Sequence, residues 1–250
     1  METGYLDLAA YYSLLFPLNE RQRGFFEQLL QDGPADSVLD VGCGTGEHLT
    51  WFSARNFRAY GLEPDMGMFR ELERRRWPGE PPTLIPRGAD ALPGAIGKSV
   101  DLVLCLGNTL PHLPDRAAVQ SAVHTMAETL SARGRIVLQT VNFDRVLDEG
   151  RASFPVIERV LPHGERVAFF REYDLEGLPE RLLFKTRLVT PIGERRAAWP
   201  LLPLRREEVM RCVGDAGLSG VQLLGDYDGM PFTEGSPALI IVGERRLPPR

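Results

Sequence analysis

A buried strand that runs directly into three alternate glycines and then into a helix constrains this chain more than any other stretch. The strand is the apolar run Ser37–Val41, the glycines are Gly42, Gly44 and Gly46, and helical spacing of apolar residues continues to Arg55. Because glycine adopts a positive φ and lets a ligand approach the backbone, this stretch predicts a tight β-to-α turn with a binding site at the helix start. A turn with nothing bound is the alternative for a glycine triplet taken alone.

Strand and helix patterns alternate from this turn as far as residue 141. The sequence predicts strands at 37–41, 57–62, 83–85, 100–106 and 135–141 and helices at 46–55, 65–76 and 115–130. That alternation predicts an α/β fold, a Rossmann-like and mostly parallel sheet with helices on both faces. Two further strands at 221–224 and 238–242 are separated by too few residues for a crossover helix. We therefore expect this last pair to be antiparallel and to complete a seven-stranded sheet.

The segments around this pattern divide the chain into three parts. Residues 1–33 are predicted to form an N-terminal helical lid, helical from Tyr5 to Leu30 with an interruption at Pro17. Residues 34–149 and 201–250 form the predicted α/β core. Residues 150–200 break the alternation, with strand-like runs at 165–173 and 181–190 and a turn at 191–193. This region predicts an antiparallel β insertion.

Composition and charge exclude several classes of protein. With 250 residues, of which 43% are hydrophobic, the chain can bury a full core. A net charge of −5 argues against nucleic acid as the main partner. No apolar run approaches the roughly 20 residues that cross a bilayer, and no secretory signal opens the chain, so we expect a cytoplasmic protein without a membrane partner. Cys43, Cys105 and Cys212 lie far apart with no Cys/His cluster, so neither a disulfide framework nor a metal site is expected.

The spacing of the glycines separates two classes of ligand. A dinucleotide fingerprint needs G-x-G-x-x-G, but Glu47 occupies the position of its third glycine. Asp40, two residues before the first glycine, would repel a pyrophosphate and would suit a ligand with an ammonium group. Glu63 follows the next strand, about 20 residues beyond the loop, where a carboxylate can accept both hydrogen bonds of a ribose diol. Asp90 follows the third strand and can accept from an adenine amine, with a turn-forming role as the alternative.

These motifs resemble, in order, those of the class I S-adenosylmethionine (SAM) dependent methyltransferases. The matching segments are VLDVGCGTGEHL, GLEPD, GAD and DLVLCLGNTLPHL, and the resemblance covers residues 36–142 and resumes over 204–243. It implies SAM as the cofactor, released as S-adenosylhomocysteine, with no metal. It also implies that Asp40 lies near the amino group of SAM and that Glu63 holds the ribose. The other contacts implied by the resemblance are Gly42, Cys43, Gly44 and Gly46 at the methionyl part, Pro64 after the ribose motif, and Met66, Ala89 and Asp90 at the adenine.

The segment Leu106-Gly107-Asn108-Thr109-Leu110-Pro111-His112 follows the fourth strand, at the edge of the sheet where ligands bind in such folds. It is similar to the corresponding segment of glycine N-methyltransferases and related small-molecule enzymes. The resemblance implies that Leu106 contacts SAM through its backbone, that Asn108 faces the substrate and that His112 approaches the cofactor. Alternatively, Asn108 only closes a turn and His112 only caps the helix near Pro114. The rest of the glycine-enzyme pattern is not evident, so glycine itself is not implied.

Methyl transfer from a sulfonium is an in-line displacement, and it needs a general base only when the acceptor is a hydroxyl or arrives protonated. His112 is the first candidate for such a base and His163 the second, whereas His48 and His124 are predicted to be structural. These roles follow from position, since only His112 lies in the segment after the fourth strand.

Tyr12 belongs to an aromatic pattern, with Tyr5 and Tyr11, that resembles the N-terminal helix of small-molecule methyltransferases. In those relatives the helix closes over SAM, so Tyr12 is expected at the cofactor. Ser13 replaces the usual Asp of the family, which puts a charge contact from this helix in doubt. Docking of an amphipathic helix by its aromatic stripe is the alternative.

The insertion at 150–200 is rich in Arg and aromatic residues. The resemblance implies that it covers the substrate or forms a dimer contact. Arg171 and Tyr173 are candidates for selecting an acidic substrate, with a solvated charged face as the alternative. The sequence therefore predicts a SAM-dependent enzyme that methylates a nitrogen or oxygen of a small molecule. A non-catalytic SAM-binding regulatory module and, less favoured, an NAD-dependent dehydrogenase remain as alternatives, and a second copy of the chain is a candidate partner.

Overall fold

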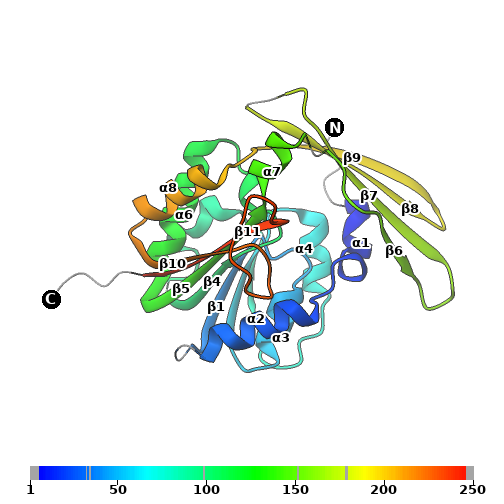
Figure 1. The fold of residues 1–250 in the computed structure, drawn as a ribbon. Coiled ribbons are helices and arrows are strands. Elements are labelled where there is room, and N and C mark those ends of the chain that lie inside the picture. Colours follow the sequence, from blue (N-terminus) through cyan, green and yellow to red (C-terminus); the bar gives the residue numbers. More distant parts are fainter. Residues whose placement is uncertain are drawn as a thin grey trace.

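The computed structural model describes residues 6–31, 33, 35–97, 99–150, 152–177 and 180–245, so Tyr5 lies outside the described residues. Seven strands form the central sheet in the order β10-β11-β5-β4-β1-β2-β3 (Figure 1). The strands are β1 (Ser37–Val41), β2 (Arg58–Leu62), β3 (Thr83–Ile85), β4 (Val100–Cys105), β5 (Leu130–Val141), β10 (Leu218–Leu224) and β11 (Ala238–Arg245). β11 runs antiparallel to both β5 and β10, and the other pairs are parallel. The predicted α/β sheet with an antiparallel final pair is confirmed.

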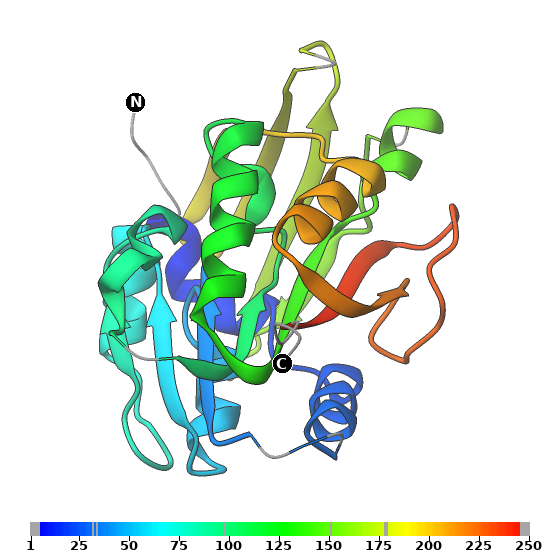
Figure 2. The ribbon, with the colours of Figure 1, turned by 90° about the vertical axis from the view of Figure 1, so that its left-hand side faces the viewer.

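Helices cover both faces of the sheet because the inner strands bury both of their faces. In β1, Val38 packs toward one face while its neighbours Leu39 and Val41 pack toward the other. The first face holds α2 (Glu20–Gln31), α3 (Glu47–Ser53) and α4 (Met66–Glu73). The second holds η1 (Ala89–Ala91), α5 (Leu92–Ala95), α6 (Arg116–Thr129) and α8 (Arg206–Asp215), as Figure 2 shows from the side.

The ends of several helices follow local capping chemistry. The Asp65 carboxylate accepts from the amides of Gly67 and Met68 and begins α4, and Asp115 begins α6 in the same way. The predicted N-terminal helix is two helices, because α1 (Leu6–Leu15) ends before Pro17 and α2 starts afresh at Glu20. β5 begins at Leu130, directly after α6 and earlier than the pattern indicated.

The insertion forms a second, antiparallel sheet in the order β6-β7-β8-β9. Its strands are β6 (Ile157–Val160), β7 (Arg166–Asp174), β8 (Leu182–Thr190) and β9 (Gly193–Leu201), and a short helix α7 (Phe143–Asp148) precedes it. The sequence predicted β7 and β8 but not β6, β9 or α7. β6 has only four residues, half of them exposed, and β9 exposes most of its residues, so neither carries an apolar run that would mark it.

Helix α1 lies between this second sheet and the core (Figure 1). Leu8 and Leu15 of α1 pack with Met68 of α4 and with Val167 and Phe169 of β7. The helix thereby joins the sheet to the core at the edge where β1 and β4 end.

Two general features bear on what the chain binds. Within the described residues, no helix combines the length and the apolar character needed to cross a membrane. Across the same residues, no group of three or more His, Cys, Asp and Glu side chains is placed to hold a metal ion, and all three cysteines carry free thiols.

Candidate active site

The loop between β1 and α3 needs its glycines for both conformation and space. Gly42, Gly44 and Gly46 have φ values of 75°, 56° and 87°, which side chains other than glycine rarely adopt. A Cβ on Gly42 would lie 2.5 Å from the side chain of Thr109, in the loop after β4. The two loops therefore meet closely, at the point where the strand order reverses and ligands bind in open α/β sheets.

The backbone amides of this loop are bonded within the protein. The amides of Gly42 and Cys43 donate to the carbonyl of Leu62, at 2.8 and 3.0 Å, and the Gly44 amide donates to the Glu63 carboxylate at 2.8 Å. A phosphate-binding loop instead presents its amides to the anion. This loop is thus unsuited to a diphosphate, in agreement with the spacing of its glycines.

Glu63 is held at the end of β2 by two amides. Its Oε2 accepts from Gly44 and its Oε1 accepts from Asp65, each at 2.8 Å. Burial raises the pKa of Glu63 to about 7, although both hydrogen bonds oppose that rise, and the carboxylates of Asp65 and Asp40 add to it. Each carboxylate oxygen keeps lone-pair capacity for a further donor, such as a sugar hydroxyl.

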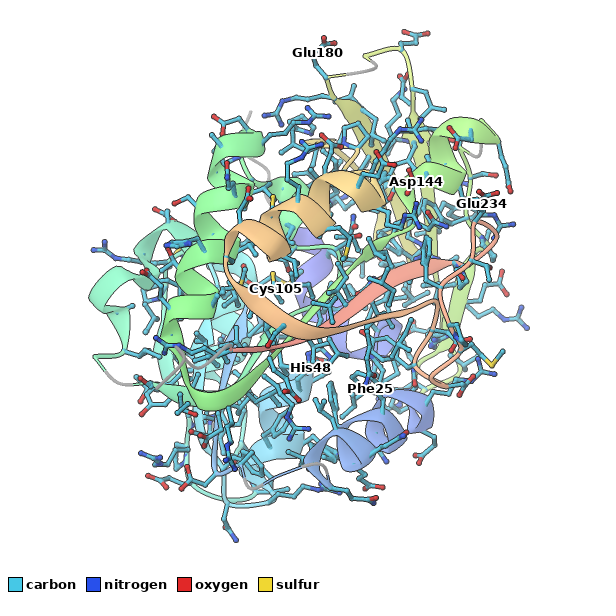
Figure 3. All side chains as sticks on the ribbon, turned by 60° about the vertical axis from the view of Figure 1, so that its left-hand side comes forward. Phe25, His48, Cys105, Asp144, Glu180 and Glu234 are labelled. Atoms are coloured by element: carbon cyan, nitrogen blue, oxygen red, sulfur yellow. The ribbon has the colours of Figure 1, made fainter. Side chains whose placement is uncertain are left out.

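Asp40 is almost fully buried and lies behind the cavity rather than in its wall. Its Oδ2 is 3.2 Å from Nδ1 of His48, and the ring of His48 stands edge-on to Phe26 of α2. Figure 3 shows His48 in the interior of the molecule, near α2, which carries the labelled Phe25. The sequence predicts only a structural role for His48, but His48 lines the cavity and links it to Asp40.

Helix α1 reaches the glycine loop through two adjacent residues. The ring of Tyr12 lies 3.4 Å from a Cβ position on Gly44, and burial raises the pKa of its hydroxyl, with smaller contributions from the carboxylates of Glu47, Glu63 and Asp40. The hydroxyl of Ser13 is 3.1 Å from that of Thr45 and accepts from Arg75 at 2.8 Å. The serine at the family's Asp position thus still bonds to the loop, without a charge.

A cavity of about 460 Å³ opens between this loop, the loop after β4, helix α1 and the second sheet. Seven of the predicted site residues line it, and they are Tyr12, Gly42, Cys43, Gly44, Leu106, Asn108 and His112. The other predicted residues, Asp40, Gly46, Glu63, Pro64, Met66, Ala89 and Asp90, do not. Met66 is half exposed and Asp90 is exposed, and Gly88 adjoins both Asp90 and Pro64, so these three expected contacts lie on a separate, open surface, whereas Ala89 is buried in the core.

Asn108 both closes a turn and faces the cavity. It has a φ of 69°, and its Oδ1 accepts from the amide of Val141 at 3.0 Å, while the Gly107 amide donates to Gln139 at 2.7 Å. These bonds hold the turn against β5. The two interpretations of Asn108 are therefore compatible, because the bonded carbonyl fixes a side chain that also lines the cavity.

His112 lies in a short 3₁₀ helix, η2 (Leu110–His112), and does not cap α6, which Asp115 begins. Its side chain lines the cavity and is exposed there, and partial desolvation by the surrounding protein lowers its pKa to about 4. His112 is thus neutral at physiological pH. His163 lies in an exposed turn and His124 on the exposed side of α6, and neither lines the cavity, so the structure gives no support to His163 as a base.

The second sheet and the β10–β11 loop supply cavity residues that sequence reasoning did not place there. These are Phe154, Arg159, Phe169 and Phe184 from the insertion and Tyr227 from the loop. Arg171 and Tyr173, which the sequence singled out, line the same cavity. The period of two along β7 was a usable signal, since it sets Val167, Phe169, Arg171 and Tyr173 on one face.

The fold is that of known methyltransferases. The CcbJ methyltransferase of Streptomyces caelestis superposes with a TM-score of 0.79 at 19% identity, covering 99% of this chain and 100% of that one. Residues 38–134 match a family described as a methyltransferase domain.

Sequence similarity to characterised enzymes extends further. The dTDP-4-amino-2,3,4,6-tetradeoxy-D-glucose N,N-dimethyltransferase of Saccharopolyspora spinosa is 31% identical over 199 residues, which is 78% of this chain and 76% of that enzyme. The glycine/sarcosine N-methyltransferase of Parasynechococcus marenigrum is 28% identical over 217 residues, 83% of this chain and 72% of that enzyme. This chain belongs to the class I SAM-dependent methyltransferase family. The prediction of a SAM-dependent enzyme of the small-molecule type is confirmed.

Proposed function

We propose that this enzyme transfers the methyl group of SAM to the nitrogen of a small amine that enters the 460 Å³ cavity. The observation that carries the proposal is the position of His112 and Asn108 in the wall that the cavity shares with the glycine loop. Both relatives described above are named as N-methyltransferases of small molecules, an amino sugar in one case and glycine or sarcosine in the other.

The low pKa of His112 favours nitrogen over oxygen as the acceptor atom. A hydroxyl must lose its proton as it attacks, so it needs a base with a pKa near the working pH. With a pKa of about 4, His112 is a weak base. A neutral amine already carries a free lone pair, so it needs only alignment and the exclusion of water. In this proposal His112 accepts a hydrogen bond from the amine, and Asn108 positions it.

SAM supplies an electrophilic methyl group on a positively charged sulfur, and the residues of the glycine loop suit such a ligand. We assign the methionyl part to Gly42, Cys43, Gly44, Gly46 and the backbone of Leu106. The ribose diol donates to Glu63, which already points at this loop through its bond to the Gly44 amide. Asp40 acts on the amino group through His48 and through its field rather than by direct contact.

The adenine and lid assignments complete this proposal. Pro64, Met66 and Asp90 form the open surface on which adenine would lie, with the buried Ala89 beneath Asp90 as backbone support, and the exposure of Met66 leaves its side chain available to pack on a ring. Tyr12 closes the methionyl side, so residues 1–33 act as a lid. Residues 150–200 cover the acceptor end of the cavity, because Phe154 and Phe169 line it.

The proposal is tested by incubating the purified enzyme with SAM and a panel of primary amines, phenols and alcohols. We expect S-adenosylhomocysteine to form together with a product one methyl group heavier, and only with amines. A methylated phenol or alcohol would refute the choice of nitrogen. SAM binding without turnover across the whole panel would instead favour a non-catalytic binding module.

A further inference from the structure

We propose that Arg171 forms an anion-binding subsite at the acceptor end of the cavity, so that the methylated amine also carries a carboxylate or phosphate group. This inference rests on the proposed function, because it concerns the second functional group of the acceptor. Arg171 lines the same cavity as Asn108 and His112.

The position of Arg171 in the second sheet is unusual for a charged side chain. It lies in the middle of β7, on the face that also carries the buried side chains of Phe169 and Tyr173, and it pairs with Thr186 of β8. This face packs against α1 and α7 through apolar residues. Arg171 is only partly exposed there, and such surroundings disfavour a guanidinium unless a partner compensates its charge.

The hydrogen bonds of Arg171 leave most of its donors unused. A guanidinium has five N–H donors. Nη2 donates to the carbonyl of Pro155 at 3.1 Å, and Nε is buried without any partner. In the part of the chain that the structure describes, no carboxylate lies within ion-pair distance of Arg171. Burial lowers its pKa, an effect partly opposed by Tyr173, but an arginine stays charged in proteins.

Aromatic rings hold the guanidinium in place. Its central carbon lies 5.2 Å from the ring centre of Phe154, 5.8 Å from that of Phe16 and 6.0 Å from that of Phe169. Such contacts orient a cation. They do not use its in-plane N–H groups, so those of Nη1 and the second one of Nη2 can donate to the oxygens of a carboxylate or phosphate.

The second arginine of the cavity wall provides the contrast. Arg159 donates to the carbonyls of Leu14, Leu15 and Glu158, at 3.2, 3.3 and 2.9 Å. Two of these carbonyls end α1, where a positive charge stabilises the helix. Arg159 therefore has a structural role in which each of its side-chain nitrogens donates a hydrogen bond. The contacts of Arg171 do not provide a comparable structural reason for a charged side chain at its position.

The two ends of the cavity carry opposite charge, which would fix the orientation of the acceptor. Glu47 lines the end at the glycine loop and pairs with Arg75, and Asp40 and Glu63 lie close behind it, so three carboxylates lie near one arginine at this end. An acceptor with an amine and an acid therefore lies with its amine toward the loop and its acid toward Arg171. In the reverse orientation the acid of the acceptor would lie beside the carboxylates at the glycine loop. Repulsion between these negative charges keeps the acid away from the methyl group of SAM.

The direct test measures anion binding in the absence of turnover. Benzoate, phenyl phosphate and neutral benzamide are titrated calorimetrically into the enzyme loaded with S-adenosylhomocysteine. We expect at least one anion to bind and benzamide to bind more weakly. R171M should weaken the anion by about tenfold or more, since a charge-assisted bond is lost. The ratio of benzoate to phenyl phosphate affinity distinguishes a carboxylate from a phosphate as the natural group.

Matched variants separate the subsite from a structural effect. R187M removes an arginine from the neighbouring strand, where Arg187 stacks on Phe170 on the other face of the sheet, and it should change anion affinity by less than about twofold. R171M should melt at or above the wild-type temperature, because an apolar side chain fits this face better. Should R171M fail to fold, R171K keeps the charge without the planar donors, and it should still lose affinity. Equal anion binding by R171M and the wild type, or no anion binding by the wild type, would overturn the inference.

A turnover assay distinguishes failure of this inference from failure of the proposed function. Amines are compared in pairs that differ only by an acid or its amide. Methylation of both members at equal rates would keep the proposed function and reject the subsite. Loss of anion binding in R171M without methylation of any amine would keep the subsite and reject the proposed function.

Discussion

Replacing Glu63 by glutamine should abolish a specific pH dependence of SAM binding. The raised pKa of Glu63, from 4.5 to about 7, corresponds to roughly 3 kcal/mol against its ionised form in the free protein. A ribose diol donates hydrogen bonds and therefore prefers the carboxylate. Below pH 7 the wild type must first lose a proton, so its affinity for SAM should fall by up to about tenfold per pH unit as the pH falls from 7 toward 5.

E63Q carries no proton to lose, so its affinity should vary little over this range. At pH 8 it should bind SAM about 30-fold more weakly than the wild type, equivalent to about 2 kcal/mol, because the amide nitrogen must face the backbone N–H of either Gly44 or Asp65 and cannot accept from a diol hydroxyl.

Calorimetric titration of S-adenosylhomocysteine between pH 5.5 and 8.5 measures both effects without catalysis. E71Q is a suitable control, since Glu71 lies on the surface of α4 and pairs only with Arg74 in the described structure. The raised pKa of Glu63 also predicts a pH dependence of the free energy of unfolding. This dependence runs opposite to that of SAM affinity. A carboxyl whose pKa is raised by folding favours the fold below pH 4.5, and this contribution is lost as the pH rises through 7. Wild-type affinity that does not change with pH, or an E63Q affinity that still does, would refute the placement of the diol at Glu63.

Three further predictions concern the acceptor side and the lid. N108A should lower kcat by about tenfold or more while changing SAM affinity by less than about threefold, and a loss confined to SAM affinity would place Asn108 on the cofactor side. H112N should lower kcat but leave the shape of its pH profile between pH 6 and 9 unchanged, because His112, with a pKa of about 4, is neutral throughout. His112 also makes the fold less stable as the pH falls from 6.5 toward 4, since the unfolded chain takes up the proton first, and H112N should remove this component of acid unfolding. R75M should speed hydrogen exchange in α1, because Arg75 bonds to Ser13 and Glu47, whereas unchanged exchange would mean that apolar packing alone holds the lid.

Much of the fold could be predicted because local patterns and global packing agree in the core. The strand at 37–41, the glycine turn and the helix after it are fully specified by burial and by backbone conformation, and the structure has them where the sequence indicates. The elements that were missed lack such a pattern. α7 is too short to show a helical period, and β9 is an edge strand with mostly exposed residues, so it needs no apolar face.

The residues of the candidate site also fall into those that could be predicted from the sequence and those that could not. Residues in the loops after β1 and β4 could be predicted to lie together, because the ends of adjacent parallel strands meet at one edge of the sheet. The contact between His48 and Asp40 could not be predicted from the sequence, although only the glycine loop and the start of α3 separate the two residues. It depends on the path of the Gly42–Gly46 loop, which turns the first residues of α3 back toward the end of β1.

The position of Arg171 at the acceptor end depends on the register of β7 against β8, which no local sequence pattern determines. β7 carries charged residues on both faces, whereas the charged residues of β8, Lys185 and Arg187, share its outward face. Arg171 pairs with Thr186 on the inward face, and Arg187, one residue further along β8, points outward. A slip of one residue in β7 would exchange Arg171 for an outward-facing neighbour and would empty the subsite of its charge. The buried side chains of Val167, Phe169 and Tyr173 prevent that slip, because it would move all three into water. The apolar residues of β7 thus determine where its one inward charge lies, so the acceptor specificity proposed here follows from the packing of this strand rather than from the number of arginines in the insertion.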